Sequence, residues 1–235
     1  MSNSTAPPIT EEDIAHFLAN TPEFFERHAE VLASVQISSA HGPRAVSLQE
    51  RQAEMLREKI KGLEQRVMEM VRNSHENEVI SQKVHEWGCE MQRITVPAEL
   101  PAAVIRGVEM HFEVPLTALR VWGVHAEHAD QDFAKGVSDD VRAFASSLTM
   151  PFCGPNLGFE PSRWLGRVQV EEGDSIAAQS LALLPLREGP IDSATPAFGL
   201  LVLGSPDPQR FEASMGTEFL TRMAELASAT LQRLR

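Results

Sequence analysis

The sequence predicts an α+β protein, in which short helices and one long helix precede a three-layer α/β/α domain. Two strands, at residues 180–187 and 198–204, carry apolar side chains on both faces, which is typical of a sheet covered on both sides. Helical patterns at residues 99–112 and 212–235 alternate with strands, and together they make three layers. A seven-residue apolar repeat within residues 47–94 predicts the long helix.

The long helix is expected to act at least in part as a coiled coil. Ser47 and Glu50 form an S-x-x-E capping box that marks its start, and Pro97 ends it. At ~1.5 Å per residue it would be on the order of 70 Å long. That is too long for one small domain to cover. The predicted dimer seam consists of Leu56, Ile60, Leu63, Val67, Met70, Asn77, Ile80, Val84, Trp87 and Met91.

Asn77 occupies a seam position where the pattern otherwise requires an apolar residue. A buried Asn in a helix seam lowers stability but fixes register and oligomer number. Alternatively, the coil ends near Arg72, and Asn77 begins the part of the helix that belongs to the globular domain. We favour a junction over a uniform coil, and in either case Asn77 marks the transition between coil and domain.

Composition and charge narrow the class of protein. The chain has 235 residues, 43% hydrophobic side chains and a net charge of −12. No apolar run approaches the ~20 residues of a membrane helix, and the N-terminus lacks the features of a signal peptide. Residues 95–235 contain 11 basic and 18 acidic side chains, which argues against direct nucleic-acid binding. Two cysteines form no disulfide framework, so we expect a soluble, cytoplasmic protein.

Three segments are expected along the chain. Residues 1–46 should hold a tail, disordered over about its first nine residues, and two short helices that begin near Thr10 and Thr21. Residues 47–94 form the long helix used for dimerisation. Residues 95–235 form the α+β domain.

Further elements are predicted within the last segment. LTALRVWG at residues 116–123 predicts a strand, and SDDVRAFASSL at residues 138–148 predicts a helix. Residues 150–166 are rich in Pro and Gly and are expected to be a loop. Residues 166–172 predict a weaker strand.

Several motifs, taken in order, resemble a known family. They are Pro22-Glu23-Phe24-Phe25, Ser47 to Gln52, Asn77-Glu78, Gly199 to Phe211 and Met215-Gly216-Thr217. The chain resembles a GAF-type domain and, more closely, the bacterial domain-of-unknown-function family 484. This resemblance spans nearly the whole chain and implies a GAF-like domain, with a mainly antiparallel central sheet, behind a helical N-terminus. It implies no established activity and no cofactor, and the family is often encoded near a tyrosine recombinase.

Four residues are candidates for a ligand pocket. Arg120, Trp122 and Ser180 are polar or amphipathic groups on otherwise apolar strands, and one face of a GAF-like sheet lines the ligand cavity. The alternative is that Arg120 extends its charge to solvent while Trp122 belongs to the core. Cys153 is a candidate nucleophile or chromophore attachment point, but no histidine partner lies near it in sequence, and a structural thiol is the default expectation.

Two histidine-containing groups could be metal ligands. His85 and Cys89 lie one helical turn apart, and His125 and His128 lie near Asp130 and Asp132. A zinc site requires four protein ligands, or three and a water, so two are insufficient. We therefore expect that His85 and Cys89 are residues on the helix surface, that His125 and His128 belong to a polar loop, and that neither group binds a metal.

The sequence shows no convincing catalytic constellation. We expect a non-enzymatic regulatory or scaffold protein, in which a GAF-like domain forms homodimers through its helices. One alternative is a small-molecule sensor with an occupied GAF-like pocket, and another is an enzyme that uses Cys153 or the histidine loop. A third, based on the family association alone, is an accessory protein of DNA recombination that acts by protein contact. The expected partner is a second copy of the chain, and another protein is an open alternative. We expect no direct binding to nucleic acid or to a membrane.

Overall fold

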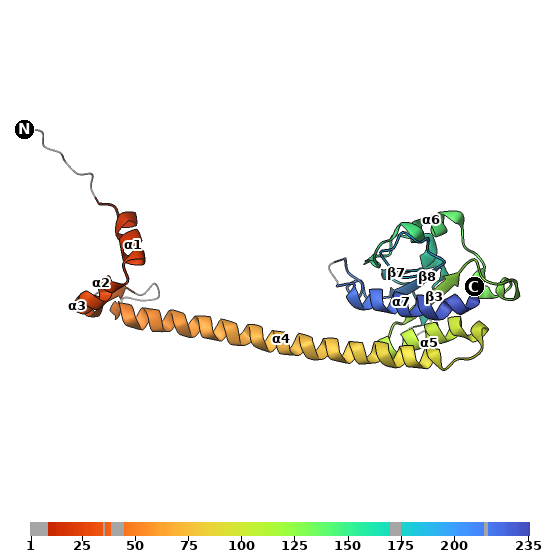
Figure 1. Ribbon diagram of the computed structural model, residues 1–235, viewed down its shortest axis with the longest axis horizontal. Helices are drawn as coiled ribbons and strands as arrows, with labels where there is room; N and C mark the ends of the chain where they lie inside the picture. The colour runs from red at the N-terminus through yellow and green to blue at the C-terminus, as the bar shows by residue number, and fades with distance from the viewer. Residues whose placement is uncertain (1–8, 35, 39–44, 170–174, 214–215) are drawn as a thin grey trace, which may run out of the picture. The chain divides into compact units, whose positions relative to one another are not determined.

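The computed structural model of the protein describes residues 9–34, 36–38, 45–169, 175–213 and 216–235 (Figure 1). The chain divides into two compact units, Met1–Ser74 and His75–Arg235. Helix α4, Leu48–Gln92, begins in the first unit and ends in the second. The first eight residues, where a disordered tail was predicted, lie outside the described part.

Helix α1, Glu11–Asn20, opens the described part of the first unit. Its capping box pairs Thr10 with Asp13: the Asp13 N–H donates to Thr10 Oγ1 at 3.2 Å, and the Thr10 N–H donates to Asp13 Oδ2 at 2.9 Å. These bonds satisfy two backbone donors that the first turn of a helix leaves free. Hydrogen bonds from Thr10 also lower the pKa of the Asp13 carboxyl.

The second predicted helix is divided into α2, Glu23–Arg27, and α3, Ala29–Ser34. The division falls at His28, whose backbone leaves the helical region with φ −124° and ψ 46°. The Phe24 ring meets the Phe17 ring of α1 edge-on, with the ring centroids 5.8 Å apart. Aromatic packing of this kind joins α1 to α2.

A two-stranded antiparallel ribbon leads into α4. Strand β1, Gln36–Ser38, pairs with β2, Ala45–Ser47. The sequence did not predict this ribbon, because strands of three residues are too short to show a clear alternation. The side chain of Ser47, and with it the capping box predicted for α4, lies outside the described part.

A four-stranded antiparallel sheet forms the centre of the second unit, in the order β3-β8-β7-β4. Its strands are β3, Leu116–Val121; β4, Phe152–Pro155; β7, Ser180–Leu186; and β8, Gly199–Ser205. In the middle of the sheet, Leu201 of β8 pairs with Leu119 of β3 on one side and Leu184 of β7 on the other. A separate ribbon joins β5, Val168–Gln169, to β6, Ser175–Ile176.

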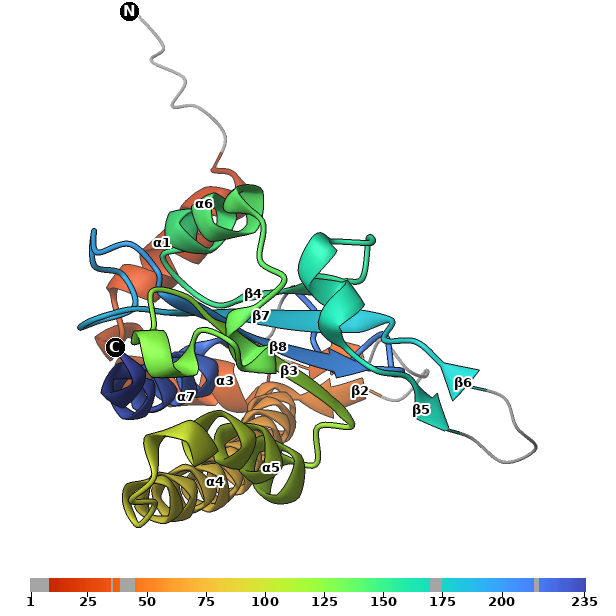
Figure 2. The same ribbon diagram turned by 90° about the vertical axis from the view of Figure 1, so that its right-hand side faces the viewer.

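Helices cover both faces of this sheet. The helices are α5, Leu100–Phe112; α6, Asp139–Ser147; α7, Glu218–Leu231; and the 3-10 turns η1, Pro97–Glu99; η2, Ala126–His128; η3, Asp132–Ala134; η4, Glu160–Trp164; and η6, Gln232–Leu234. Figure 2 shows α5 and α7 on one side of the sheet and α6 on the other. The predicted α+β class, with an antiparallel sheet, is confirmed. In the described part of the chain, no helix is both long and apolar enough to cross a membrane.

Two predicted elements differ from the structure. Strand β4 lies in the segment predicted to be a loop, and the weaker strand predicted at residues 166–172 is reduced to the two residues of β5 in the described part. Both strands are short, and β4 exists because its backbone pairs with β7. Pairing of this kind depends on tertiary context more than on local sequence.

A separate hydrophobic cluster packs on each face of the sheet. The first joins the sheet to the end of α4, to α5 and to α7, and it includes Trp87, Leu184 and Met223. The second joins the opposite face to α6 and η4, and it includes Leu183 and Val202. The side chains of β7 and β8 are buried throughout, as the two-faced apolar pattern of these strands predicts.

A buried arginine connects β7 to three neighbouring segments. Arg187 is 2% exposed, and its guanidinium donates hydrogen bonds to the end of α6 and to the loop between β7 and β8. The acceptors are the backbone carbonyls of Ala145, Ser146, Leu148, Ser193 and Thr195. The Arg187 backbone N–H donates to Ser228 Oγ of α7 at 3.1 Å. Burial lowers the pKa of the guanidinium.

Close packing of α4 on α5 depends on a glycine. Trp87 of α4 is fully buried, and its ring lies over Gly107 of α5. A Cβ added at Gly107 would lie 2.1 Å from Trp87 Cδ1 and 2.3 Å from Nε1, far inside van der Waals contact. The Trp87 ring also meets Phe112 edge-on at 5.9 Å between centroids. The indole therefore has little room to move away.

We predict that Gly107→Ala destabilises the second unit by about 1–3 kcal/mol, because the added methyl overpacks the contact with Trp87. Urea unfolding followed by tryptophan fluorescence measures this, since all three tryptophans belong to that unit. The matched control is Gly62→Ala on α4, where a Cβ would meet nothing within 4 Å. The control should leave the midpoint unchanged, and equal midpoints for both variants would contradict the packing argument.

Candidate functional site

Arg120 and Trp122 lie on the sheet face covered by α6 and η4. Trp122 Nε1 donates to the carbonyl of Ala197 at 2.8 Å. The Arg120 guanidinium donates to the carbonyl of Leu119 at 3.0 Å and lies over the Trp164 ring, 5.5 Å from its centroid. Both side chains are partly buried and already engaged within the chain.

Aromatic side chains pack on this same face. Phe159 stacks on Phe144 of α6 with 6.2 Å between ring centroids, and it meets Phe152 of β4 edge-on at 5.6 Å. Trp164 and Leu165 pack against the same cluster. The face where the sequence led us to expect a ligand cavity is thus occupied by large side chains.

Cys153 and Ser180 lie on the opposite face from Arg120. Cys153 packs in the cluster beneath α4, α5 and α7, and strand alternation places Ser180 on the same face as Ala182 of that cluster. Ser180 Oγ donates to the carbonyl of Asp207 at 2.6 Å. The four pocket candidates therefore do not share one site. Arg120 and Trp122 lie on one face of the sheet, and Cys153 and Ser180 lie on the other.

Burial controls the chemistry of Cys153. The side chain is 8% exposed, and burial raises the pKa of its thiol to about 11. The thiolate is the reactive form of cysteine. At neutral pH Cys153 is consequently held as an unreactive thiol, as expected for a structural cysteine.

The two histidine-containing groups do not assemble a metal site. His85 Nε2 lies 3.7 Å from Cys89 Sγ on the surface of α4, and His128 Nε2 lies 3.4 Å from a carboxylate oxygen of Glu127. Within the described ranges, no group of three or more His, Cys, Asp or Glu side chains could hold a metal ion. Each pair falls short of a complete ligand set.

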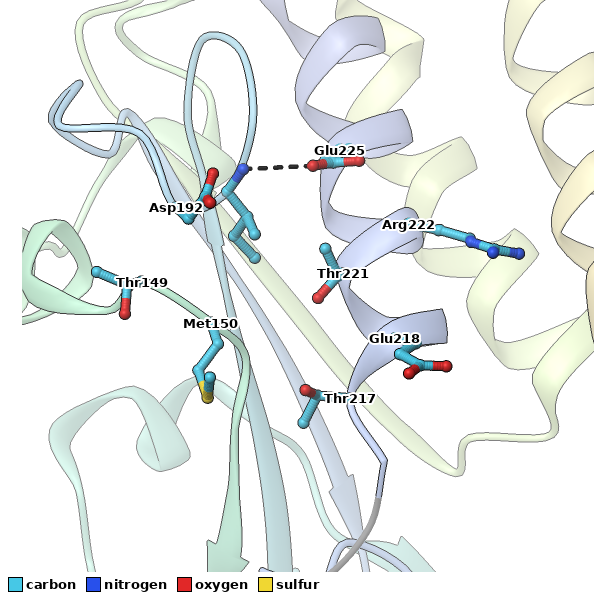
Figure 3. A pocket seen from close by; sticks show the side chains of 9 residues that line it. Thr149, Met150, Asp192, Thr217, Glu218, Thr221, Arg222 and Glu225 are labelled. Atoms are coloured by element: carbon cyan, nitrogen blue, oxygen red, sulfur yellow. Dashed lines mark hydrogen bonds between the residues drawn. The ribbon is translucent and has the colours of Figure 1, made fainter.

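A pocket of about 540 Å³ opens between α7, the segment before β4 and the loop between β7 and β8 (Figure 3). Its lining residues are Thr149, Met150, Ile191, Asp192, Thr217, Glu218, Thr221, Arg222 and Glu225. In Figure 3 Thr217 and Thr221 lie across the pocket from Met150, whereas Arg222 points away. Glu225 Oε1 accepts a hydrogen bond from the Ile191 N–H at 3.3 Å, which fastens the loop to α7.

The sequence did not reveal this pocket, because its walls come from three separate segments of the chain. Its lining combines hydroxyl groups and the exposed carboxylate of Asp192 with the apolar side chains of Met150 and Ile191. Its volume falls within the range of small-molecule sites. The arrangement suits a small molecule with both polar and apolar groups, because hydroxyl groups donate as well as accept hydrogen bonds.

A run of exposed apolar side chains lies on α4 within the first unit. The large side chains that share one face of the helix are half exposed or more: Leu56 59%, Ile60 54%, Leu63 50%, Val67 58% and Met70 70%. They are the first five residues of the predicted dimer seam. A continuous apolar stripe of this kind typically marks an interaction site.

The rest of the predicted seam has a different position. Val84, Trp87 and Met91 are buried in the core of the second unit, and Ile80 packs against that core. Val84, Trp87 and Met91 are therefore not available to a partner chain, and Ile80 is partly buried by its own domain. The predicted dimer seam was thus too long. A seven-residue period shows that one helix face is apolar, but it does not show which element covers that face.

Asn77 lies close to the division between the two units. It is exposed and stands three residues after Ser74, the last residue of the first unit. The apolar stripe on the first unit therefore ends before Asn77, and the buried face of α4 begins after it.

Comparisons with known proteins identify one family. The chain matches the family described as "Protein of unknown function, DUF484" over residues 4–235. No curated protein matches it.

Several solved structures are similar to the chain. A GAF domain from Pseudomonas syringae pv. tomato is 18% identical, with 69% of this chain and 91% of that chain covered and a TM-score of 0.43. The GAF domain of an Acinetobacter phosphoenolpyruvate-protein phosphotransferase is 12% identical, with 65% and 92% covered and a TM-score of 0.41. A free methionine-R-sulfoxide reductase from Neisseria meningitidis is 12% identical, with 65% and 88% covered and a TM-score of 0.39. These likenesses transfer no ligand or activity to this chain.

We predict that iodoacetamide alkylates Cys89 but not Cys153 in the folded protein at neutral pH. Cys89 is partly exposed on α4, whereas Cys153 is buried and its thiolate forms only as the pH approaches about 11. Peptide mass spectrometry measures both sites, and protein unfolded in guanidinium, where both cysteines should react, is the control. Alkylation of Cys153 at the same rate in folded and unfolded protein would show that the site holds an accessible thiolate.

Proposed function

Since the chain belongs to the DUF484 family, whose description names no activity, we propose a function from its own surfaces: a non-enzymatic regulatory or scaffold protein of the cytoplasm. In this proposal two copies associate through the exposed apolar face of α4, and each copy presents its α+β unit to other molecules. The partner is a second copy of the same chain. The acidic second unit, with a net charge that repels phosphate, is not a nucleic-acid surface.

The observation that carries this proposal is the exposed stripe from Leu56 to Met70. A single helix in water leaves these five side chains half exposed or more. Covering them with a second helix would remove apolar surface from water, at roughly 25 cal/mol for each Å². Charged residues such as Lys59 and Glu64 border the stripe, as they do in soluble coiled coils. Self-association accounts for both features.

The chemistry of the second unit supports a role without catalysis. Its buried cysteine is a protonated thiol at neutral pH, and one sheet face is filled by aromatic side chains. Most carboxylates and histidines of the described residues in this unit lie on the surface.

We predict that Leu63→Glu converts the protein from a dimer to a monomer. The substitution places a carboxylate at the centre of the apolar stripe, next to its own copy on the partner helix, and should raise the dissociation constant about 100-fold or more. Sedimentation velocity measures the change, from twice the chain mass to the single-chain mass of 26.0 kDa. Circular dichroism should show that the variant keeps its helical content, because Leu63 is half exposed.

The control is Gln65→Glu, which adds the same charge two residues away on the side of α4 opposite the stripe. This variant should remain dimeric. A wild-type protein that is monomeric at tens of micromolar, or a Leu63→Glu variant that associates as the wild type does, would refute the proposed self-association through α4.

A second candidate function is that of a small-molecule sensor, and the pocket in Figure 3 is the observation that favours it. A sensor should copurify with a small-molecule ligand, visible by native mass spectrometry as added mass. Thr221→Trp, which fills the pocket from α7, should abolish that mass. Two results would contradict a sensor that uses this pocket. The wild-type protein would show only the mass of the polypeptide, or the added mass of a ligand would persist in the Thr221→Trp variant.

A further inference from the structure

The exposed stripe of α4 has the residue pattern of a two-stranded coiled coil. In heptad notation, with Ile60 and Val67 at position a, position d holds Leu56, Leu63 and Met70. In parallel coiled coils, β-branched residues at a together with leucine at d favour two strands over higher oligomers. All five side chains are 50–70% exposed, so the face is open to a second helix.

The charges beside the stripe favour a parallel pair. In a parallel and in-register coiled coil, position g of one helix faces position e of the next heptad on the other. Lys59 at g would face Glu64 of the second copy, and symmetry repeats this attraction on the other side. Arg66, the next residue at g, would face the uncharged Val71. The parallel arrangement thus gains two attractions and contains no repulsion between these positions.

The antiparallel arrangement is less favourable. There, position e faces e and position g faces g. When the apolar layers are aligned, Arg57 would face Glu64 of the second copy, but Lys59 would face Arg66. Attraction on one flank is offset by repulsion between like charges on the other. The charges therefore distinguish the two orientations, although the apolar residues could fill the layers of either.

The end of the stripe coincides with the end of the first unit. Continuing the heptad places Ser74 at position a and Asn77 at position d, and the chain divides between Ser74 and His75. We propose that two copies pair in parallel and in register along residues 53–71, an inference that rests on the proposed self-association through α4. The second units of the two copies would then begin side by side at the same end of the coil.

Disulfide trapping tests the orientation in the full-length chain. Leu56→Cys and Met70→Cys are prepared separately in a Cys89→Ser background, and each is oxidised after purification. A disulfide requires Cα atoms within about 7 Å, so only a parallel, in-register pair brings each new cysteine to its own copy. Both variants should yield roughly tenfold more crosslinked dimer than the control Gln65→Cys, which lies at the outward-facing position f.

The outcomes separate this inference from the proposed function. Self-crosslinking at both positions supports the parallel pair. In a second outcome, the wild type and the reduced variants sediment as dimers, but a crosslink forms only when Leu56→Cys is mixed with Val67→Cys. This result would show an antiparallel pair and overturn the proposed orientation alone. Dimers without any of these crosslinks would place the interface elsewhere, and monomers would overturn self-association itself.

A charge reversal gives an independent readout of orientation. In the parallel pair Lys59→Glu replaces two attractions to Glu64 with repulsions, and the dissociation constant should rise roughly three- to tenfold. In an antiparallel pair the same change removes the repulsion between Lys59 and Arg66, so the constant would fall. Lys59→Glu combined with Glu64→Lys should restore wild-type association, and failure of this rescue would overturn the proposed contact.

Discussion

The fold of the second unit depends on how the buried guanidinium of Arg187 is satisfied. A buried charge destabilises a protein unless hydrogen bonds replace its hydration. Here backbone carbonyls provide them for the two terminal nitrogens, though not for Nε, and two of the carbonyls belong to the last turn of α6, where the helix dipole adds negative potential. Each carbonyl left without this donor would cost ~1–3 kcal/mol. The end of β7 therefore fixes the position of α6, and with it the Thr149–Met150 wall of the pocket.

The sequence predicts the parts of this fold that have a local signal. Strands β7 and β8 are apolar on both faces, and α5 and α7 have clear helical periodicity, so these elements were predictable. Strand β4 was not, because it consists of four residues that include Gly154 and Pro155 and becomes a strand by pairing with β7. The role of Arg187 was hidden for a related reason. A charged residue that follows an apolar strand commonly marks its exposed end, and only the folded chain shows the carbonyls that surround it.

The candidate site was harder to predict than the fold. Alternation along one strand indicates which of its residues share a face, but relating two strands requires their register. Cys153 is placed by its pairing with Ala182, whose neighbour on β8 is Leu203. Sequence reasoning could therefore name Arg120 and Cys153 but could not show that the sheet separates them. The pocket beside α7 is assembled from three distant segments, and no spacing in the sequence records their proximity.

Helix α4 shows the same limit within a single element. Its seven-residue period runs through Leu63 in the first unit and Trp87 in the second, yet Leu63 is 50% exposed and Trp87 is fully buried. A seven-residue period indicates that a helix has an apolar face, but it does not indicate which element packs on that face. What distinguishes the two halves is a short polar interval that contains Ser74 and Asn77, where an apolar seam would lose its packing. After the interval the apolar face is covered by α5 and α7, whereas before it the side chains of the stripe are half exposed or more. The interval thus separates an exposed apolar surface from one that its own domain covers, and it lies where the two compact units divide.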